Sequence, residues 1–234
     1  MLVAWHIGRF SAFLISVFSA VTWVTADLSS GHIYSNYTIP IWNSMMRLGF
    51  FLVVAHFLTT NKKLLEREEE MARTDSLTGA GNGRYFYELA NIEMDRTERF
   101  NRTLTLAYID IDNFKQINDT LGHSTGDMLL KSIAEAIREN LRSMDIIARL
   151  GGDEFAVLLP ETGQEQSEAV IGKIRKYLLD MTEKNNWPVT FSIGVVTCRR
   201  HPCNIDQFLK AADDLMYSVK KSGKNMTRYK DLDA

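Results

Sequence analysis

The stretch Arg142–Phe155 (RSMDIIARLGGDEF) decides how the rest of this sequence is interpreted. Two apolar, β-branched runs, Ile146–Leu150 and Phe155–Leu159, flank a Gly-Gly-Asp-Glu tetrad, an arrangement typical of a β-hairpin with an acidic tip. The paired glycines Gly151 and Gly152 allow positive φ and let a bulky anion approach bare main chain. Two neighbouring carboxylates are costly to crowd together unless a cation lies beside them. The hairpin is therefore a candidate site for a metal ion and an anionic substrate.

A second acidic position lies upstream. The alternation in Thr103–Asp110 predicts a core strand that ends in the acidic tripeptide Asp110-Ile111-Asp112. A carboxylate at a strand end, together with one from a neighbouring hairpin, can hold magnesium against a triphosphate. Taken alone, an Asp in this place is commonly a turn or helix cap. The acidic hairpin makes the metal interpretation the stronger one.

The segment Gly151–Phe155 resembles the signature of the GGDEF diguanylate cyclases, which join two GTP into cyclic di-GMP. The resemblance runs from about residue 74 to 230 and rests on several motifs in the same order. They are Asp75–Gly79, Asn113–Asp127, the strand Val189–Val196 and an Ala-Asp-x-x-x-Tyr-x-x-Lys-x-x-Gly-x-Asn motif that ends at Asn225. The resemblance implies an α+β catalytic domain over residues 75–234 with a βαββαβ, palm-like and ferredoxin-like order. The sequence departs from the family at Ala80 and Gly83, where a leucine and an arginine are usual.

The resemblance also implies the catalytic and metal residues. Asp153 and Glu154 are the expected catalytic carboxylates, and two Mg²⁺ ions, with Mn²⁺ as an alternative, are expected at Asp110, Ile111 and Asp153. Magnesium prefers such oxygen ligands and commonly shares them with substrate phosphates. Which carboxylate acts as the base stays open.

A third set of residues is implied to bind GTP. Asn118 and Asp127 are the expected guanine ligands, because an amide and a carboxylate match hydrogen-bonding groups that adenine lacks. The expected neighbours of the phosphates are Phe114, Lys115, Lys220 and Lys224. Asp127 could instead be a helix N-terminal acid, and the two C-terminal lysines could simply favour a helix C-terminus.

Arg142 and Asp145 look like the inhibitory product-binding site of the family, with Lys173 as a further basic residue. Arginine can form a fork to phosphate or stack on guanine, and the carboxylate can accept from the base edge. The alternative is a surface ion pair between residues three apart.

The amino-terminal region differs sharply in composition from the rest. Its first 60 residues contain three formal charges, Arg9, Asp27 and Arg47, although the whole chain has a net charge of −2 and a mean hydropathy of −0.15. Apolar segments at about residues 10–28 and 39–59 predict a transmembrane α-hairpin over 1–60, with a soluble buried hairpin as the alternative. Basic residues flank both outer ends and are absent between them, which places both ends in the cytoplasm. Arg47 is expensive in mid-bilayer and is expected to snorkel, pair or face a partner helix.

Residues 61–74 predict a charged linker helix. Apolar residues seven positions apart would allow a short parallel coiled coil with a second copy. A solvated single helix is the alternative. Cys198 and Cys203, with His201 between them, lack a second ligand pair for zinc and are expected to be reduced thiols.

These observations predict a homodimeric diguanylate cyclase at a bacterial inner membrane, with its catalytic domain in the cytoplasm. Its expected partners are GTP, cyclic di-GMP, a second copy and membrane lipid, with no nucleic acid. A non-catalytic receptor for cyclic di-GMP or GTP is the alternative, and a different nucleotide cyclase on the same palm is a third possibility.

Overall fold

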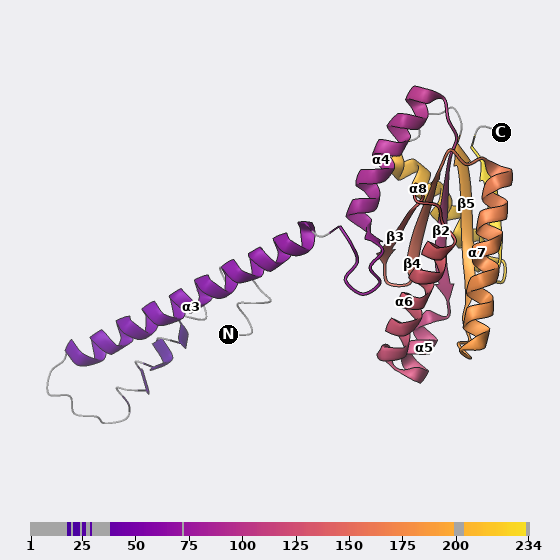
Figure 1. Ribbon diagram of the computed structural model, residues 1–234. Helices are drawn as coiled ribbons and strands as arrows, with labels where there is room; N and C mark the ends of the chain where they lie inside the picture. Colours follow the sequence, from indigo (N-terminus) through magenta and orange to yellow (C-terminus); the bar gives the residue numbers. More distant parts are fainter. Residues whose placement is uncertain are drawn as a thin grey trace. The chain divides into compact units, whose positions relative to one another are not determined.

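The computed structural model describes residues 18–19, 21–23, 25–26, 29, 38–71, 73–198 and 204–232. The chain divides into two compact units, Met1–Met71 and Ala72–Ala234. Each is described by itself (Figure 1). Most of the first predicted apolar helix, residues 10–28, falls outside the described residues.

The first unit is dominated by one helix, α3 (Thr38–Met71), which runs without interruption for 34 residues. Its stretch Ile41–Lys62, with a mean hydropathy of 1.4, is long and apolar enough to cross a membrane, judged by length and composition alone. In the part of the chain that the structure describes, no other helix meets this criterion. The guanidinium group of Arg47 lies 4.4 Å from the ring centroid of Trp23, so Arg47 is paired by a cation–π contact rather than isolated among apolar side chains.

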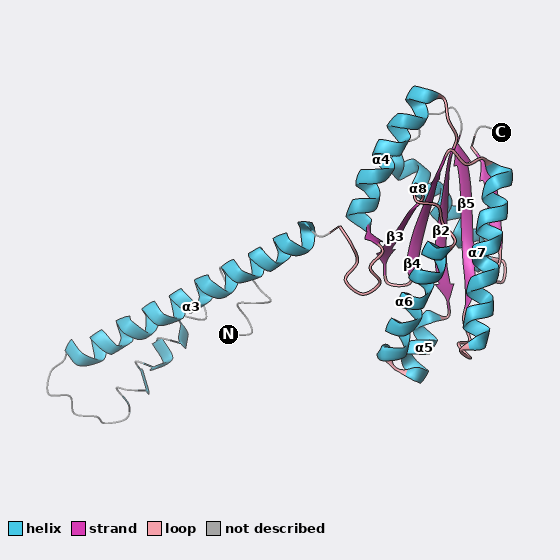
Figure 2. Cartoon of the chain, viewed as in Figure 1, coloured by secondary structure: helices cyan, strands magenta, loops and turns pink. Residues whose placement is uncertain are grey.

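The second unit is a six-stranded mixed sheet with helices on both faces (Figure 2). In chain order its elements are β1 (Gly81–Asn82), α4 (Gly83–Phe100), β2 (Leu104–Asp112), α5 (Phe114–Leu121), α6 (His123–Glu139), β3 (Ile146–Gly151), β4 (Glu154–Pro160), α7 (Gln164–Lys184), β5 (Thr190–Cys198), α8 (Ile205–Lys221) and β6 (Thr227–Asp231).

The strand order across the sheet is β1-β3-β4-β2-β5-β6. The central pairs β2–β4, β2–β5 and β3–β4 are antiparallel, whereas the outer pairs β1–β3 and β5–β6 are parallel. From β2 to β5 the elements follow the βαββαβ order, with two helices, α5 and α6, in the first crossover. The predicted α+β class is therefore confirmed. The strands β1 and β6 extend the sheet beyond that core, and α4 and α8 are additional helices.

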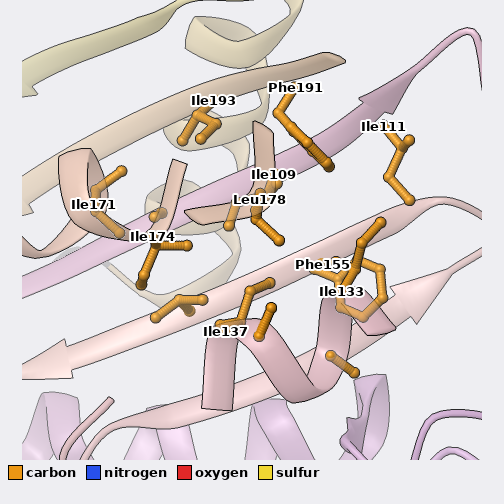
Figure 3. Packing of buried hydrophobic residues seen from close by; sticks show 14 of the residues in the cluster. Ile109, Ile111, Ile133, Ile137, Phe155, Ile171, Ile174, Leu178, Phe191 and Ile193 are labelled. Carbon is orange, nitrogen blue, oxygen red and sulfur yellow. The ribbon is translucent and has the colours of Figure 1, made fainter. Parts of the chain in front are cut away.

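Both faces of the sheet are covered, so its central strands are buried and mostly apolar. All nine positions of β2 are buried. Its odd-numbered side chains, such as Ile109, pack with Phe155 and Phe191 beneath α6 and α7, as Figure 3 shows. Its even-numbered side chains, such as Leu106 and Tyr108, pack beneath α4 and α8. Residues 108, 110 and 112 therefore share the α8 face, because side chains alternate along a strand.

The acidic hairpin forms as predicted from β3 and β4, with an irregular register between Arg149 and Gly151. Only one of its two glycines has positive φ: Gly152 has φ of +50°, whereas Gly151 remains in β3. Of the two glycines, Gly152 alone uses the positive φ that both allow.

Cys198 is buried at the end of β5 and forms no disulfide bond with another described residue. His201 and Cys203 lie outside the described residues.

Helix α8 lies unusually close to β5 at Gly194. A Cβ atom at this position would lie 2.2 Å from the Ala212 carbonyl oxygen and 2.4 Å from the Met216 nitrogen. Both are backbone atoms and cannot swing away as a side chain would. Glycine is therefore required for the distance between this helix and the sheet.

We expect Gly194→Ala to destabilise the protein by about 2 kcal/mol, the usual range for overpacking, because α8 must shift away from β5. The free energy of unfolding in urea measures this. Gly172→Ala on α7 is the matched control, since its Cβ would meet no atom within 4 Å and should be neutral or stabilising by up to about 1 kcal/mol. A Gly194→Ala protein as stable as the control would contradict the prediction.

Candidate functional site

The pairing of β2 with β4 brings the acidic residues of two distant segments together. Asp110 lies directly opposite Glu154 in the antiparallel register. The backbone N–H of Ile111 donates to the carbonyl oxygen of Asp153 over 3.3 Å. The three candidate carboxylates, Asp110, Asp153 and Glu154, therefore lie at one end of the same strand pair.

Asp110 is almost fully buried, with 2% of its surface exposed, and is paired with a lysine from α8. The Nζ atom of Lys220 donates to its Oδ2 atom over 2.5 Å. Burial raises the pKa of Asp110 to about 6, with help from the charges of Asp153 and Glu154 and against the opposing effect of Lys220. Burial lowers the pKa of Lys220, but the hydrogen bond and charge of Asp110 outweigh it and raise that pKa overall. The site thus holds more negative charge than its one lysine neutralises.

Tyr108 is a contact of the acidic tip that the sequence did not reveal. Its hydroxyl group donates to Oε2 of Glu154 over 3.0 Å. Burial, followed by the nearby charge of Glu154, raises the pKa of Tyr108, so its proton stays available for this hydrogen bond. The available signal was a tyrosine two residues before Asp110 in a buried strand, because a buried hydroxyl group needs a hydrogen-bond partner.

Asp112, the other acid of the tripeptide, accepts three hydrogen bonds. It accepts from the hydroxyls of Thr190 and Ser192, each over 2.7 Å, and from the backbone N–H of Asn225 over 3.1 Å. Its role is to tie β5 and the turn before β6 to the end of β2.

The two candidate guanine ligands lie on α5 and α6, which pack against each other. A Cβ atom at Gly126 would lie 2.0 Å from Oδ1 of Asn118 and 3.3 Å from Phe114, so the absence of a side chain at Gly126 makes room for both. Asp127, the next residue, is exposed. Helix α6 begins at His123, earlier than the sequence pattern indicated, so Asp127 lies beyond its first turn. The helix dipole therefore gives little reason for an acid at this position.

The remaining candidate phosphate ligands are both exposed. Lys115 lies in the first turn of α5. Lys224 lies in the turn after α8, and its Nζ atom donates to Oδ1 of Asn113 over 2.8 Å. Lys224 therefore faces the junction of β2 and α5.

The candidate inhibitory residues are only partly brought together. Asp145 accepts from the backbone N–H of Arg142 over 2.8 Å. Burial raises the pKa of Asp145 against this hydrogen bond and the charge of Arg142. Among the described residues no ion pair joins the Arg142 guanidinium group to Asp145, so the surface ion pair considered above does not form. Lys173 is exposed on α7.

Arg149 is a second residue that the sequence did not single out. Its guanidinium group donates to the Gly152 carbonyl oxygen over 2.7 and 3.0 Å and pairs with Asp75 at 3.1 Å. Asp75 in turn accepts from the backbone and hydroxyl of Thr78. Burial opposes the ionised form, but these bonds prevail and lower the pKa of Asp75. The start of the domain is thereby fastened to the turn of the acidic hairpin, and a charged residue in the apolar run Ile146–Leu150 was the overlooked signal.

The carboxylates of Asp110, Asp153 and Glu154 fit a magnesium ion whose remaining coordination positions are filled by substrate. Among the described residues no three His, Cys, Asp or Glu side chains form a group that could hold a metal ion alone. Magnesium usually takes one or two carboxylates and keeps its other positions for water and phosphate oxygens. The excess negative charge around Asp110 provides the attraction.

Comparison with known proteins defines the class. Residues 72–226 match the model of the family "Diguanylate cyclase, GGDEF domain". The chain belongs to the GGDEF diguanylate cyclase family.

Individual relatives agree with this assignment. The probable diguanylate cyclase DgcC of Escherichia coli K12 is 36% identical over 173 residues, which cover 72% of this chain and 47% of DgcC. Diguanylate cyclase DosC of the same organism is 31% identical, over 78% of this chain and 42% of DosC. The chain spans about half the length of the curated relatives it matches.

Solved structures share the fold. The GGDEF domain of DgcB from Caulobacter crescentus, crystallised in complex with c-di-GMP, is 28% identical with a TM-score of 0.60, over 67% of this chain and 92% of that domain. The active GGEEF domain of a diguanylate cyclase from Vibrio cholerae is 27% identical with a TM-score of 0.58, over 63% and 96%.

We expect Asp110→Asn to stabilise the metal-free protein at pH 8 and to lose this advantage as the pH falls. The pKa of Asp110 is raised in the folded state to about 6, so above that pH the fold holds a carboxylate at a cost that Asn does not carry. As the pH falls below it, the folded wild-type protein takes up a proton and the cost shrinks; the cost is fully gone only below about 4, the ordinary value for Asp, where the unfolded chain is protonated too.

Thermal unfolding in EDTA at pH 8 and pH 5 measures the difference. Asp95→Asn, at an exposed site on α4, is the control and should change little at either pH. An Asp110→Asn protein less stable than wild type at pH 8 would show that the ion pair with Lys220 outweighs the burial cost.

Proposed function

We propose that this protein is a diguanylate cyclase that condenses two GTP into cyclic di-GMP and two pyrophosphates. The observation that carries the proposal is that Asp110 of β2 pairs with Glu154 of the adjacent strand β4, with Asp153 beside them. The family membership of residues 72–226 supports it.

Asp110, Asp153 and the Ile111 carbonyl oxygen are the proposed ligands of two magnesium ions, with Mn²⁺ as a substitute. When bound, the metal polarises the α-phosphate and neutralises the leaving pyrophosphate. Asp153 and Glu154 are the proposed catalytic carboxylates, positioned to accept the proton of the 3′-hydroxyl group. Tyr108 holds Glu154 in one orientation through its hydrogen bond.

Asn118 and Asp127 are proposed to bind the guanine base, which the close packing of Asn118 on Gly126 supports. Phe114, Lys115, Lys220 and Lys224 are the proposed neighbours of the phosphates. Lys220 already occupies the anionic end of the site, where it can exchange its bond to Asp110 for one to a phosphate oxygen. This exchange would leave Asp110 available to the metal.

Each domain supplies half of the reaction, so the active form is proposed to be a homodimer. In each half, the 3′-oxygen of one GTP forms a bond to the α-phosphorus of the other. The bond from that phosphorus to the pyrophosphate breaks, and the 3′-hydroxyl proton leaves to a carboxylate. Two such steps close the ring. Linker residues 61–74 are proposed to pair as a short coiled coil with the second copy.

Arg142, Asp145 and Lys173 are proposed to bind product and inhibit the enzyme. In support, Asp145 is not tied to the Arg142 side chain, so the guanidinium group can meet a phosphate or guanine.

The amino-terminal unit is proposed to anchor the enzyme as a transmembrane hairpin in a bacterial inner membrane, with the catalytic domain in the cytoplasm. The length and hydropathy of Ile41–Lys62 support one span. The contact of Arg47 with Trp23 supports a second, because it joins residues of the two apolar segments and gives the charge a partner.

The purified full-length protein with GTP and Mg²⁺ should form cyclic di-GMP, detected by mass spectrometry. Asp110→Asn should lower the rate by at least about 100-fold, because an electrostatic group at the reacting phosphate is lost. Asp95→Asn is the matched control and should retain the rate. Absence of product from wild type, with cyclic di-GMP still bound, would favour the receptor alternative. A cyclic product from ATP would favour a different cyclase.

Arg142→Ala should abolish inhibition by added cyclic di-GMP while leaving the initial rate unchanged, because the residue lies outside the reacting groups. The measurement is the initial rate at increasing product concentration. Lys131→Ala, which removes an exposed charge from α6, is the control and should remain inhibited. Undiminished inhibition of Arg142→Ala would place the product site elsewhere.

A further inference from the structure

The turn between α8 and β6 has a costly backbone conformation. Its three residues Gly223, Lys224 and Asn225 have consecutive positive φ angles of 112°, 64° and 49°. For residues with a side chain this conformation costs about 1–2 kcal/mol each. Such a turn persists only where its surroundings hold it in place.

Two hydrogen bonds donated by backbone N–H groups of the turn connect it to α8 and β2. The N–H of Lys224 donates to the carbonyl oxygen of Val219 over 3.1 Å, at the end of α8. The N–H of Asn225 donates to Oδ2 of Asp112 over 3.1 Å, at the end of β2. These bonds fix the N–H groups of Lys224 and Asn225. The carbonyl oxygen of Asn225 has a different partner.

That partner is Arg175 of α7, 50 positions away in sequence. Its Nη2 atom donates to the Asn225 carbonyl oxygen over 2.6 Å and to the Asn225 side-chain Oδ1 over 2.8 Å. Its Nε atom is buried and has no hydrogen-bond partner among the described residues. The adjacent buried residues of α7, Ile174 and Leu178, pack in the core of the domain. Arg175 therefore reaches the turn from a rigid element.

The residue that this turn presents is Lys224. With the backbone held, its Nζ atom meets Oδ1 of Asn113 over 2.8 Å, at the junction of β2 and α5. A flexible turn would spread the ammonium group over many positions, and each immobilised long side chain costs free energy on binding. A preformed turn removes part of that cost before substrate arrives.

We propose that Arg175 is a positioning residue for triphosphate binding: it clamps Asn225 and so presents Lys224 to the β- and γ-phosphates of GTP. This inference rests on the proposed function, which assigns Lys224 to the phosphates. Arg175 acts through Asn225 and does not touch the substrate.

The test compares two nucleotides bound by the full-length protein in detergent with Mg²⁺. They are 3′-deoxyguanosine triphosphate, which lacks the attacking hydroxyl group and cannot react, and 3′-deoxyguanosine monophosphate. Arg175→Ala should weaken binding of the triphosphate about tenfold, a loss of about 1.4 kcal/mol, and leave the monophosphate unchanged. Lys176→Ala is the matched control, because it removes an exposed positive charge from the neighbouring position of α7; it should bind both nucleotides as wild type does.

Amide hydrogen exchange gives a readout that a general loss of stability would not reproduce. In Arg175→Ala the amides of Lys224 and Asn225 should exchange faster, while those of α7 and the central strands stay protected. The inference is overturned if Arg175→Ala behaves like Lys176→Ala, if both nucleotides are weakened equally, or if wild type binds the triphosphate no better than the monophosphate. Failure of the proposed function would be seen in a different experiment, because wild-type protein incubated with GTP would then form no cyclic di-GMP.

Discussion

The antiparallel pairing of β2 with β4 is the constraint on which the candidate site depends. A shift by one residue would turn every side chain of β2 to the opposite face of the sheet. Asp110 would then point into the apolar layer beneath α6 and α7, and Ile109 would face Lys220. Apolar packing on both faces fixes the register, so the free energy of the core also sets the position of the acids. The site also has an energetic cost. The buried Asp110 lies near the carboxylates of Asp153 and Glu154, and its charge is compensated by Lys220.

Much of this architecture could be predicted from sequence, and the reasons are local. The bounds of α8, Ile205–Lys221, are readable from sequence because the helix is amphipathic and both ends carry ordinary signals: the Asn204 cap before it and Gly223 after it. The acidic hairpin was equally clear from its two apolar runs. The linker segment proved to be the continuation of α3, which reaches Met71 without a break.

The features that the sequence did not predict have a common cause: each depends on tertiary contacts. Strand β6 is a polar five-residue segment that is extended only because it pairs with β5, and β1 has two residues. The side-chain network of Arg149, Asp75 and Gly152 joins residues 74 positions apart, and no local pattern indicates such a partner. The resemblance to the family assigned Asp110, and not Asp112, to the metal, but the sequence indicated no role for Asp112. The structure distinguishes the two residues: Asp112 accepts three hydrogen bonds, whereas Asp110 is buried beside two other carboxylates and pairs with Lys220.

The contact between Gly126 and Asn118 has a consequence for how such a gene can change. Every glycine codon becomes an alanine codon by one base substitution, and at this position the added methyl group would occupy the space of the Asn118 amide. The acidic residues lie on the strands β2 and β4 and the turn before β4, whereas Asn118 and Gly126 lie on α5 and α6. One base substitution could therefore displace the Asn118 side chain without changing any residue of the acidic strand ends.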